Sequence, residues 1–90
     1  MSKFKLIDDV SVVYYAETIQ GKVDFDGEII EFRYYEDSNG AKNWILLDGK
    51  WQLEFDEKYE SIFLACGSIQ LSKDSKAGEV FDTDDYDDEI

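Results

Sequence analysis

The sequence predicts a mainly β protein, an antiparallel meander that forms a small barrel or sandwich, with an α+β arrangement as the alternative. Three two-residue turn signals, Asp26-Gly27, Asn39-Gly40 and Asp48-Gly49, follow one another at short intervals. Such pairs tolerate the positive φ that tight hairpin turns require. The chain has 90 residues, of which 43% are hydrophobic and 16% aromatic, so we expect one small domain with an aromatic-rich core.

The registers that these turns imply are mutually compatible. Residues paired outward from each turn bring apolar side chains opposite one another and charges opposite countercharges, which stabilises a sheet. We therefore expect a four-stranded meander over roughly residues 21–55. The expected partners are Val23–Ile30 and Lys22–Glu31 around the first turn, Tyr34–Ile45, Phe32–Leu47, Tyr35–Trp44 and Asp37–Lys42 around the second, and Leu46–Trp51 and Trp44–Leu53 around the third.

The expected meander has two apolar faces. An open sheet would leave one of them exposed, so we expect another part of the chain to cover the second face. The segments 3–7 and 10–16 are rich in β-branched and aromatic residues and read as further strands, joined at Asp8-Asp9. The first face carries Val23, Phe25, Ile30, Phe32, Tyr34, Ile45 and Leu47, and the second carries Ile29, Tyr35, Trp44, Leu46, Trp51, Leu53 and Phe55.

Residues 56–72 admit two interpretations. Tyr59, Ile62, Phe63 and Cys66 recur at helical spacing, and Asp56 is a suitable N-cap, which describes a short helix near 56–66. A hairpin that turns at residues 66–67 would instead place Leu64 opposite Ile69 and Ile62 opposite Leu71. Short apolar runs are poorly resolved by period alone, and we favour the hairpin slightly.

The composition changes near residue 73. We expect a β-rich globular domain over 1–72, a polar linker over 73–78 and an acidic tail over 79–90. Seven of the last twelve residues are acidic and none is basic, so mutual repulsion predicts that the tail is disordered in isolation.

Several chemistries are excluded or disfavoured by composition. The chain has no His, which removes the commonest general base and the commonest metal ligand. Cys66 is the only cysteine, so we expect a small buried apolar residue in a reducing, cytoplasmic setting. Asp82, Asp84 and Asp85 lack the Gly and Glu that complete an EF-hand loop. We therefore expect no enzyme activity, no metal site and no cofactor, and no segment is long enough to span a membrane.

Charge is the strongest functional signal. Nine basic residues against twenty-two acidic ones give a net charge of −13, which opposes direct binding to nucleic acid and to anionic lipid. It exceeds the magnitude of about 2–8 that solubility needs in a small domain. Acids on alternate strand positions, about 6.6 Å apart, could present a phosphate-like field to a basic cleft. The candidate partner-binding residues are Asp24, Asp26, Glu28, Glu36, Asp37, Asp48, Glu54, Asp56, Glu57, Glu60, Asp82, Asp84, Asp85, Asp87, Asp88 and Glu89.

We therefore predict a non-enzymatic acidic inhibitor that mimics nucleic acid and occupies the binding surface of a basic nucleic-acid-binding protein. In kind, without a shared motif, the chain resembles the small acidic DNA-mimic proteins that phages and mobile elements direct against host nucleases, restriction, CRISPR or repair factors, such as the uracil-DNA glycosylase inhibitors. The net charge divides into −7 from the tail and −6 from residues 1–78, which hold fifteen acids and nine bases. A charge of −6 is within the ordinary range for a soluble domain, which weakens the argument for the sheet and makes the tail the stronger candidate.

Two alternatives remain. The first is a small β-barrel that binds single-stranded nucleic acid and has an acidic protein-docking tail. One expected face of the sheet carries Trp44, Trp51, Tyr35 and Arg33, and such proteins stack bases on aromatic side chains. The tail over residues 81–90 resembles the protein-docking tails of bacterial and phage single-strand DNA-binding proteins. The second alternative is a structural interaction module with a solubilising tail.

Overall fold

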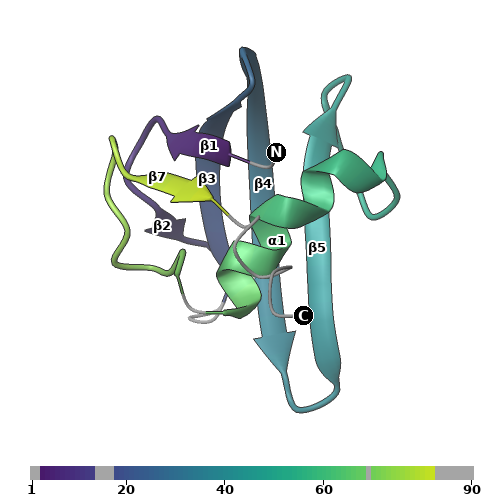
Figure 1. The fold of residues 1–90 in the computed structure, drawn as a ribbon. Helices are drawn as coiled ribbons and strands as arrows, with labels where there is room; N and C mark the ends of the chain where they lie inside the picture. The colour runs from purple at the N-terminus through teal and green to yellow at the C-terminus, as the bar shows by residue number, and fades with distance from the viewer. Residues whose placement is uncertain (1–2, 14–17, 69, 83–90) are drawn as a thin grey trace, which may run out of the picture.

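The computed structural model describes residues 3–13, 18–68 and 70–82. They form one antiparallel sheet in the order β6-β5-β4-β3-β1-β7, with β2 paired to β3, and one helical segment in front of it (Figure 1). The mainly β class and the short helix near 56–66 are therefore confirmed. The strands are β1 Lys3–Leu6, β2 Ser11–Val12, β3 Ile19–Phe25, β4 Glu28–Asp37, β5 Gly40–Leu47, β6 Lys50–Gln52 and β7 Val80–Asp82, and the helical segment is η1 Glu57–Tyr59 followed by α1 Glu60–Gly67.

The first and third hairpins form as the sequence predicts. Asp26 and Asp48 adopt positive φ of 56° and 53°, and the glycine after each does the same. Val23 lies opposite Ile30, and Leu46 lies opposite Trp51. Because β6 ends at Gln52, the expected Trp44–Leu53 pair lies beyond the ladder.

The pairing register of the second hairpin differs from the prediction by two residues, because its turn lies one residue earlier. The turn is Ser38-Asn39, and Gly40, at φ 130°, already belongs to β5. The Asp37 carboxylate accepts a hydrogen bond of 2.8 Å from the Asn39 N–H, which stabilises this earlier turn. A shift of two leaves every side chain on its expected face. The observed partners are Phe32–Ile45, Arg33–Trp44, Tyr34–Asn43, Tyr35–Lys42 and Asp37–Gly40.

Residues 57–67 are helical, so the favoured hairpin is wrong. Asp56 caps the segment by accepting from the Lys58 N–H. The helical period puts Tyr59, Ile62, Phe63 and Cys66 on one buried side, where a hairpin would instead have buried Leu64, which is 55% exposed. The Phe63 ring lies 6.1 Å from the Phe32 ring, centroid to centroid. The helix therefore packs on the first apolar face of the sheet, the face that carries the core.

We expected another part of the chain to cover the second apolar face, but the described residues leave much of it exposed. We call the side of β3–β6 opposite α1 the open face. Among the described side chains there, Ile29 is 57% exposed, and Tyr35, Trp44 and Trp51 are half-buried. The Arg33 guanidinium lies 4.2 Å above the Trp51 ring, which shields part of this apolar surface.

The beginning of the acidic tail belongs to the sheet. Val80–Asp82 form β7, which pairs with β1, so the expectation of an unfolded tail is wrong for these residues. The Phe81 ring is buried and stacks on Phe4 at 5.4 Å. The expected linker is also attached to the rest of the fold, because the Ser75 carbonyl oxygen accepts a hydrogen bond from the Val10 N–H. Burial of Phe81 explains why β7 forms despite its charge. Residues 83–90 lie outside the described part of the chain.

Candidate functional site

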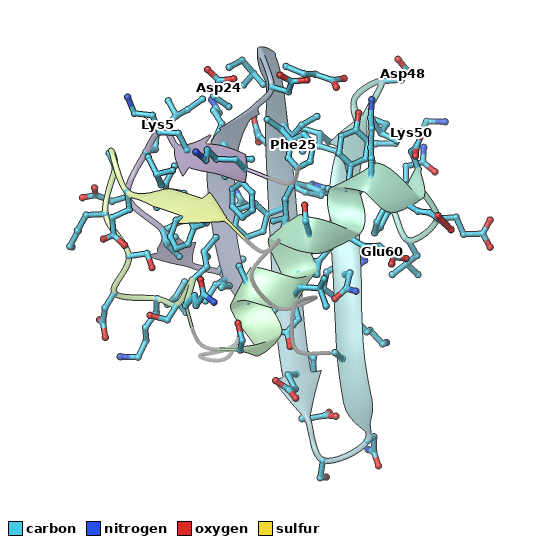
Figure 2. The ribbon with its side chains drawn as sticks, in the orientation of Figure 1. Lys5, Asp24, Phe25, Asp48, Lys50 and Glu60 are labelled. Carbon is cyan, nitrogen blue, oxygen red and sulfur yellow. The ribbon has the colours of Figure 1, made fainter. Side chains whose placement is uncertain are left out.

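The ten candidate carboxylates of the body lie at both ends of the sheet and beside the helix. Asp24, Asp26 and Glu28 surround the β3–β4 turn. Asp48, in the β5–β6 turn, lies at the same end of the sheet as Asp24 (Figure 2). Glu36 and Asp37 end β4 at the opposite end. The remaining four precede or begin the helical segment, namely Glu54, Asp56, Glu57 and Glu60.

These carboxylates do not form the row along the strands that alternate spacing suggested. Asp24 lies on the open face, Asp26 lies in a turn, and Glu28 turns toward the helix, where it contacts Tyr59. The charges therefore reach the surface from several turns and from the helix start. All ten are exposed except Asp24, which is half-buried.

Three of the carboxylates are held by tyrosine hydroxyls. Tyr59 donates to Glu28 at 2.9 Å. Tyr34 donates to Glu36 at 2.9 Å, and Tyr35 donates to Asp37 at 3.0 Å. Hydrogen bonds to a carboxylate are stronger than those between neutral groups, so these contacts restrict the rotation of otherwise mobile side chains.

Backbone donors hold further members of the set. The Gly27 N–H donates to Asp24 at 2.8 Å, and the Lys58 N–H donates to Asp56 at 3.1 Å. Asp37 also accepts from the backbone in its own turn. Among the described contacts, each of five carboxylates thus accepts a hydrogen bond that fixes its position, namely Asp24, Glu28, Glu36, Asp37 and Asp56.

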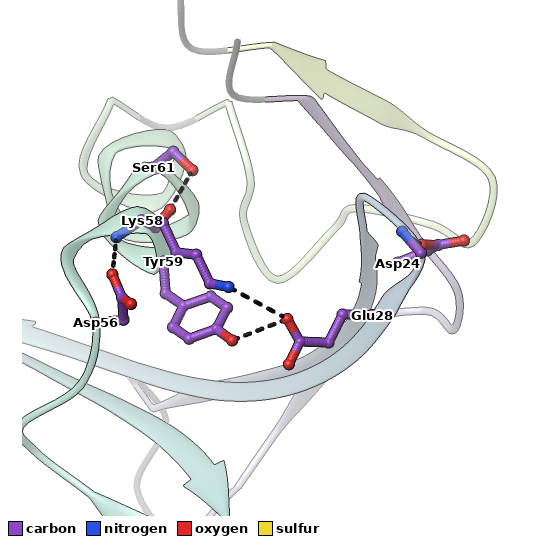
Figure 3. Close-up of polar contacts among 7 residues, drawn as sticks. Asp24, Glu28, Asp56, Lys58, Tyr59 and Ser61 are labelled. Carbon is purple, nitrogen blue, oxygen red and sulfur yellow. Dashed lines mark hydrogen bonds and ion pairs between the residues drawn. The ribbon is translucent and has the colours of Figure 1, made fainter.

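The contact between Glu28 and the helical segment is the best defined of these. Figure 3 shows Glu28 Oε1 accepting from the Tyr59 hydroxyl, with the Lys58 ammonium 3.7 Å from the same oxygen. Burial raises the pKa of Tyr59, and the hydrogen bond to Glu28 adds to the shift. The hydroxyl therefore stays protonated and remains a donor at neutral pH. The contact also ties η1 to the first residue of β4.

Tyr34 is similarly held as a donor. Its burial, together with the hydrogen bond to Glu36 and the charge of Glu36, raises the pKa of Tyr34 to about 12. The sequence contains a signal for this arrangement that was not among our predictions. Tyr34 and Glu36, like Tyr35 and Asp37, are two residues apart on a strand, so each pair shares a face.

The tail begins at the acid-rich end of the sheet. Asp82 lies opposite Lys3 in the β1–β7 ladder, and Phe4 lies opposite Phe25 beside the β3–β4 turn. The chain therefore leaves β7 at the end that carries Asp24 and Asp26. The other tail candidates, Asp84, Asp85, Asp87, Asp88 and Glu89, lie outside the described residues.

Three other features of the described ranges concern metal ligands, the cysteine and the helix. No group of three or more Cys, Asp or Glu side chains there could hold a metal ion. Burial raises the pKa of the Cys66 thiol, so it is an apolar core residue, as the sequence suggests. No helix among these residues has the length and apolar character needed to cross a bilayer.

Comparison of the chain with known protein families, curated proteins and solved structures yielded no match.

Proposed function

We propose that the protein is a non-enzymatic acidic inhibitor that occupies the nucleic-acid-binding surface of a basic protein. The observation that carries the proposal is the fixed orientation of exposed carboxylates on a chain of net charge −13. A nucleic-acid-binding cleft recognises negative charges at set positions, and preorganised charges lose less conformational entropy on binding than mobile ones. Long-range attraction to a basic surface would also speed association.

The acid-rich end of the sheet is the part of the body best suited to this role. Asp24, Asp26, Glu28 and Asp48 lie at this end, and β7 ends there too. The tail adds five carboxylates after Asp82, so the body and tail charges add rather than oppose each other. This arrangement fits inhibitors of the kind that phages and mobile elements use against host nucleases.

The test is affinity capture by the immobilised full chain at low salt, followed by a binding assay on each captured protein. We expect a captured nucleic-acid-binding protein to lose its affinity for an oligonucleotide when the chain is added. Recovery of no such protein, or oligonucleotide binding that persists with the chain in excess, would sink the proposal.

Two variants assign the effect to the body or to the tail. The body variant carries Glu28→Gln, Glu36→Gln and Asp37→Asn, which remove charge while keeping size. The tail variant ends at Asp82, because an earlier cut would remove Phe81 from the core. Screening by salt should weaken the inhibition, since exposed charges act over only about 10 Å at 0.1 M ionic strength.

A second candidate function is supported by the open face. Trp44 and Trp51 are only half-buried there, and Arg33 stacks on Trp51, which is the combination that single-strand binders use for base stacking. Quenching of tryptophan fluorescence by a single-stranded oligonucleotide, reduced in Trp44→Leu, would support this function. Unchanged fluorescence at low salt would exclude it.

A further inference from the structure

Within the described part of the chain, the outer edge of β5 has a strand partner along less than half of its length. The short strand β6 pairs with β5 only from Ile45 to Leu47, whereas β5 begins at Gly40. Among the described residues, no strand pairs with the outer side of β5 between Gly40 and Trp44. Gly40, Ala41 and Lys42 are exposed, as expected for an open edge.

The register shows which backbone groups point outward. Asp37 and Gly40 close a two-residue turn, so their backbones exchange hydrogen bonds. In an antiparallel ladder every second pair does the same, which here means Tyr35–Lys42 and Arg33–Trp44. Ala41 and Asn43 therefore direct their N–H and C=O groups away from β4, to the outer edge. Ile45 and Leu47, two and four positions further on, use the same side to pair with β6.

Two hollows flank this edge, one on each face of the sheet. The first, of about 260 Å³, lies beside α1 and is lined by apolar and polar side chains, namely Tyr34, Ala41, Asn43, Glu60, Phe63 and Leu64. The second, also of about 260 Å³, lies near the β4–β5 turn and is lined by Tyr35, Asp37, Asn39, Gly40, Ala41 and Lys42. Ala41 lines both hollows.

We propose that the edge of β5 from Gly40 to Trp44 binds an extended, basic segment of a partner protein by adding it to the sheet as a further strand. Backbone hydrogen bonds to Ala41 and Asn43 supply affinity. The side chains of an added strand alternate between the two faces, so successive residues enter the two hollows and supply specificity. The proposal deepens the proposed function, and it rests on it for the basic character of the partner.

Charge selects this occupant over the alternatives. Among the described residues, Glu36, Asp37 and Glu60 lie around the edge, and Lys42 is the only basic residue that lines either hollow. Glu36 and Glu60 lie on the α1 side of the sheet. A segment that alternates Lys or Arg with apolar residues would therefore direct its basic side chains to that side and its apolar side chains to the open face, beside Tyr35. A second copy of the chain would bring two charges of −13 together, and the chain's own acidic tail would meet like charges.

The hollow beside α1 contains one group that an added strand could satisfy. The Oδ1 atom of Asn43 is buried and has no hydrogen-bond partner among the described residues. A buried carbonyl oxygen left unpaired is unfavourable, so a small rotation of Asn43 toward a donor on the bound segment would favour binding.

The probe is a seven-residue peptide that alternates Arg with Val, titrated into the isotope-labelled full chain and followed by NMR. We expect shifts centred on residues 40–44 and slower amide exchange at Ala41 and Asn43. A peptide with Glu in place of Arg should not bind. Shifts confined to the β3–β4 turn, or no change in exchange at Ala41 and Asn43, would overturn the proposal.

Two pairs of variants separate the edge from general charge effects. Ala41→Pro removes an outward N–H and should weaken peptide binding about three- to tenfold, whereas Ala41→Val changes the side chain but keeps the N–H and should weaken binding less. Should Ala41→Pro prevent folding, Glu60→Lys should weaken binding about two- to fivefold. Its control, Glu57→Lys, makes the same charge change outside the hollow, and an equal loss in both would contradict the edge.

Failure of this proposal is distinguishable from failure of the proposed function. Capture of a nucleic-acid-binding protein with equal strength by the Ala41→Pro chain would refute the edge and leave the inhibitor role intact. Specific peptide binding without any inhibition of such a protein would support binding at the edge and refute the inhibitor role. A concentration-dependent dimer that Ala41→Pro abolishes would show that a second copy takes the edge, and would overturn the assignment to a basic partner.

Discussion

Gly21 offers the sharpest test of how the core is packed. A Cβ atom added at this position would lie 2.7 Å from both Cε1 and Cζ of the Phe32 ring. Carbon atoms in favourable contact are about 3.5–4.0 Å apart, so the ring would have to move by roughly 1 Å. Phe32 is fully buried and packs edge-on against Phe63, which restricts that movement.

Gly21→Ala should therefore destabilise the protein. Overpacking a core costs about 1–3 kcal/mol, and replacing Gly in a strand recovers about 0.5–1 kcal/mol, so the middle of the two ranges gives a net loss of about 1 kcal/mol. For a domain of this size, that corresponds to a fall in Tm of about 4–8 °C. Thermal and urea unfolding followed by circular dichroism would measure it.

Two further variants test whether the contact with Phe32 causes the loss of stability. Gly67→Ala is the matched control, because its Cβ would lie at an ordinary contact distance of 3.5 Å from the Tyr34 hydroxyl oxygen. Phe32→Leu removes the clashing ring atoms, so Gly21→Ala should cost less in that background than in the wild-type chain. An unchanged Tm in Gly21→Ala, or an equal cost in both backgrounds, would show that this contact does not limit the core.

Three further outcomes are expected. Because the pKa of Tyr34 is raised to about 12 in the folded state from 10.0, the folded state holds its proton more tightly, so stability should fall as pH rises from about 10 to 12. This fall, measured as the urea midpoint, should be smaller in Tyr34→Phe. Cys66 should react with a thiol reagent only after unfolding, since burial disfavours the thiolate, and rapid reaction of the native protein would contradict its placement. Phe81→Ala should cost about 3 kcal/mol, because the ring is buried against Phe4, and no loss on urea unfolding would mean that β7 contributes little.

Local chemistry was sufficient to predict the meander. The Asp-Gly turns and the apolar alternation around them specify the first and third hairpins, including the partners Val23–Ile30 and Leu46–Trp51. The second turn was misplaced because Asn39-Gly40 and Ser38-Asn39 are both acceptable two-residue turns. The Asp37 side chain, which bonds the Asn39 N–H, favours the latter.

The candidate site was predicted in composition and missed in arrangement. The exposed carboxylates were identified one by one from the sequence, and nine of the ten described in the body are exposed. The hydroxyl of Tyr59, which fixes Glu28, is 31 residues away in sequence. No local pattern predicts such a contact, because it depends on where the helix settles on the sheet.

The sequence by itself determines the strand periodicity, two of the three hairpin registers and the strong negative charge, because each depends on residues close together in the chain. Only the tertiary structure decides that residues 57–67 are helical, since both a helix and a hairpin bury apolar side chains there and the shape of the sheet selects between them. It likewise places Phe81 in the core, where burial against Phe4 outweighs the repulsion that sequence alone predicts for the acidic tail. The open edge of β5 also emerges only in the fold, because it depends on β6 ending three residues after its turn.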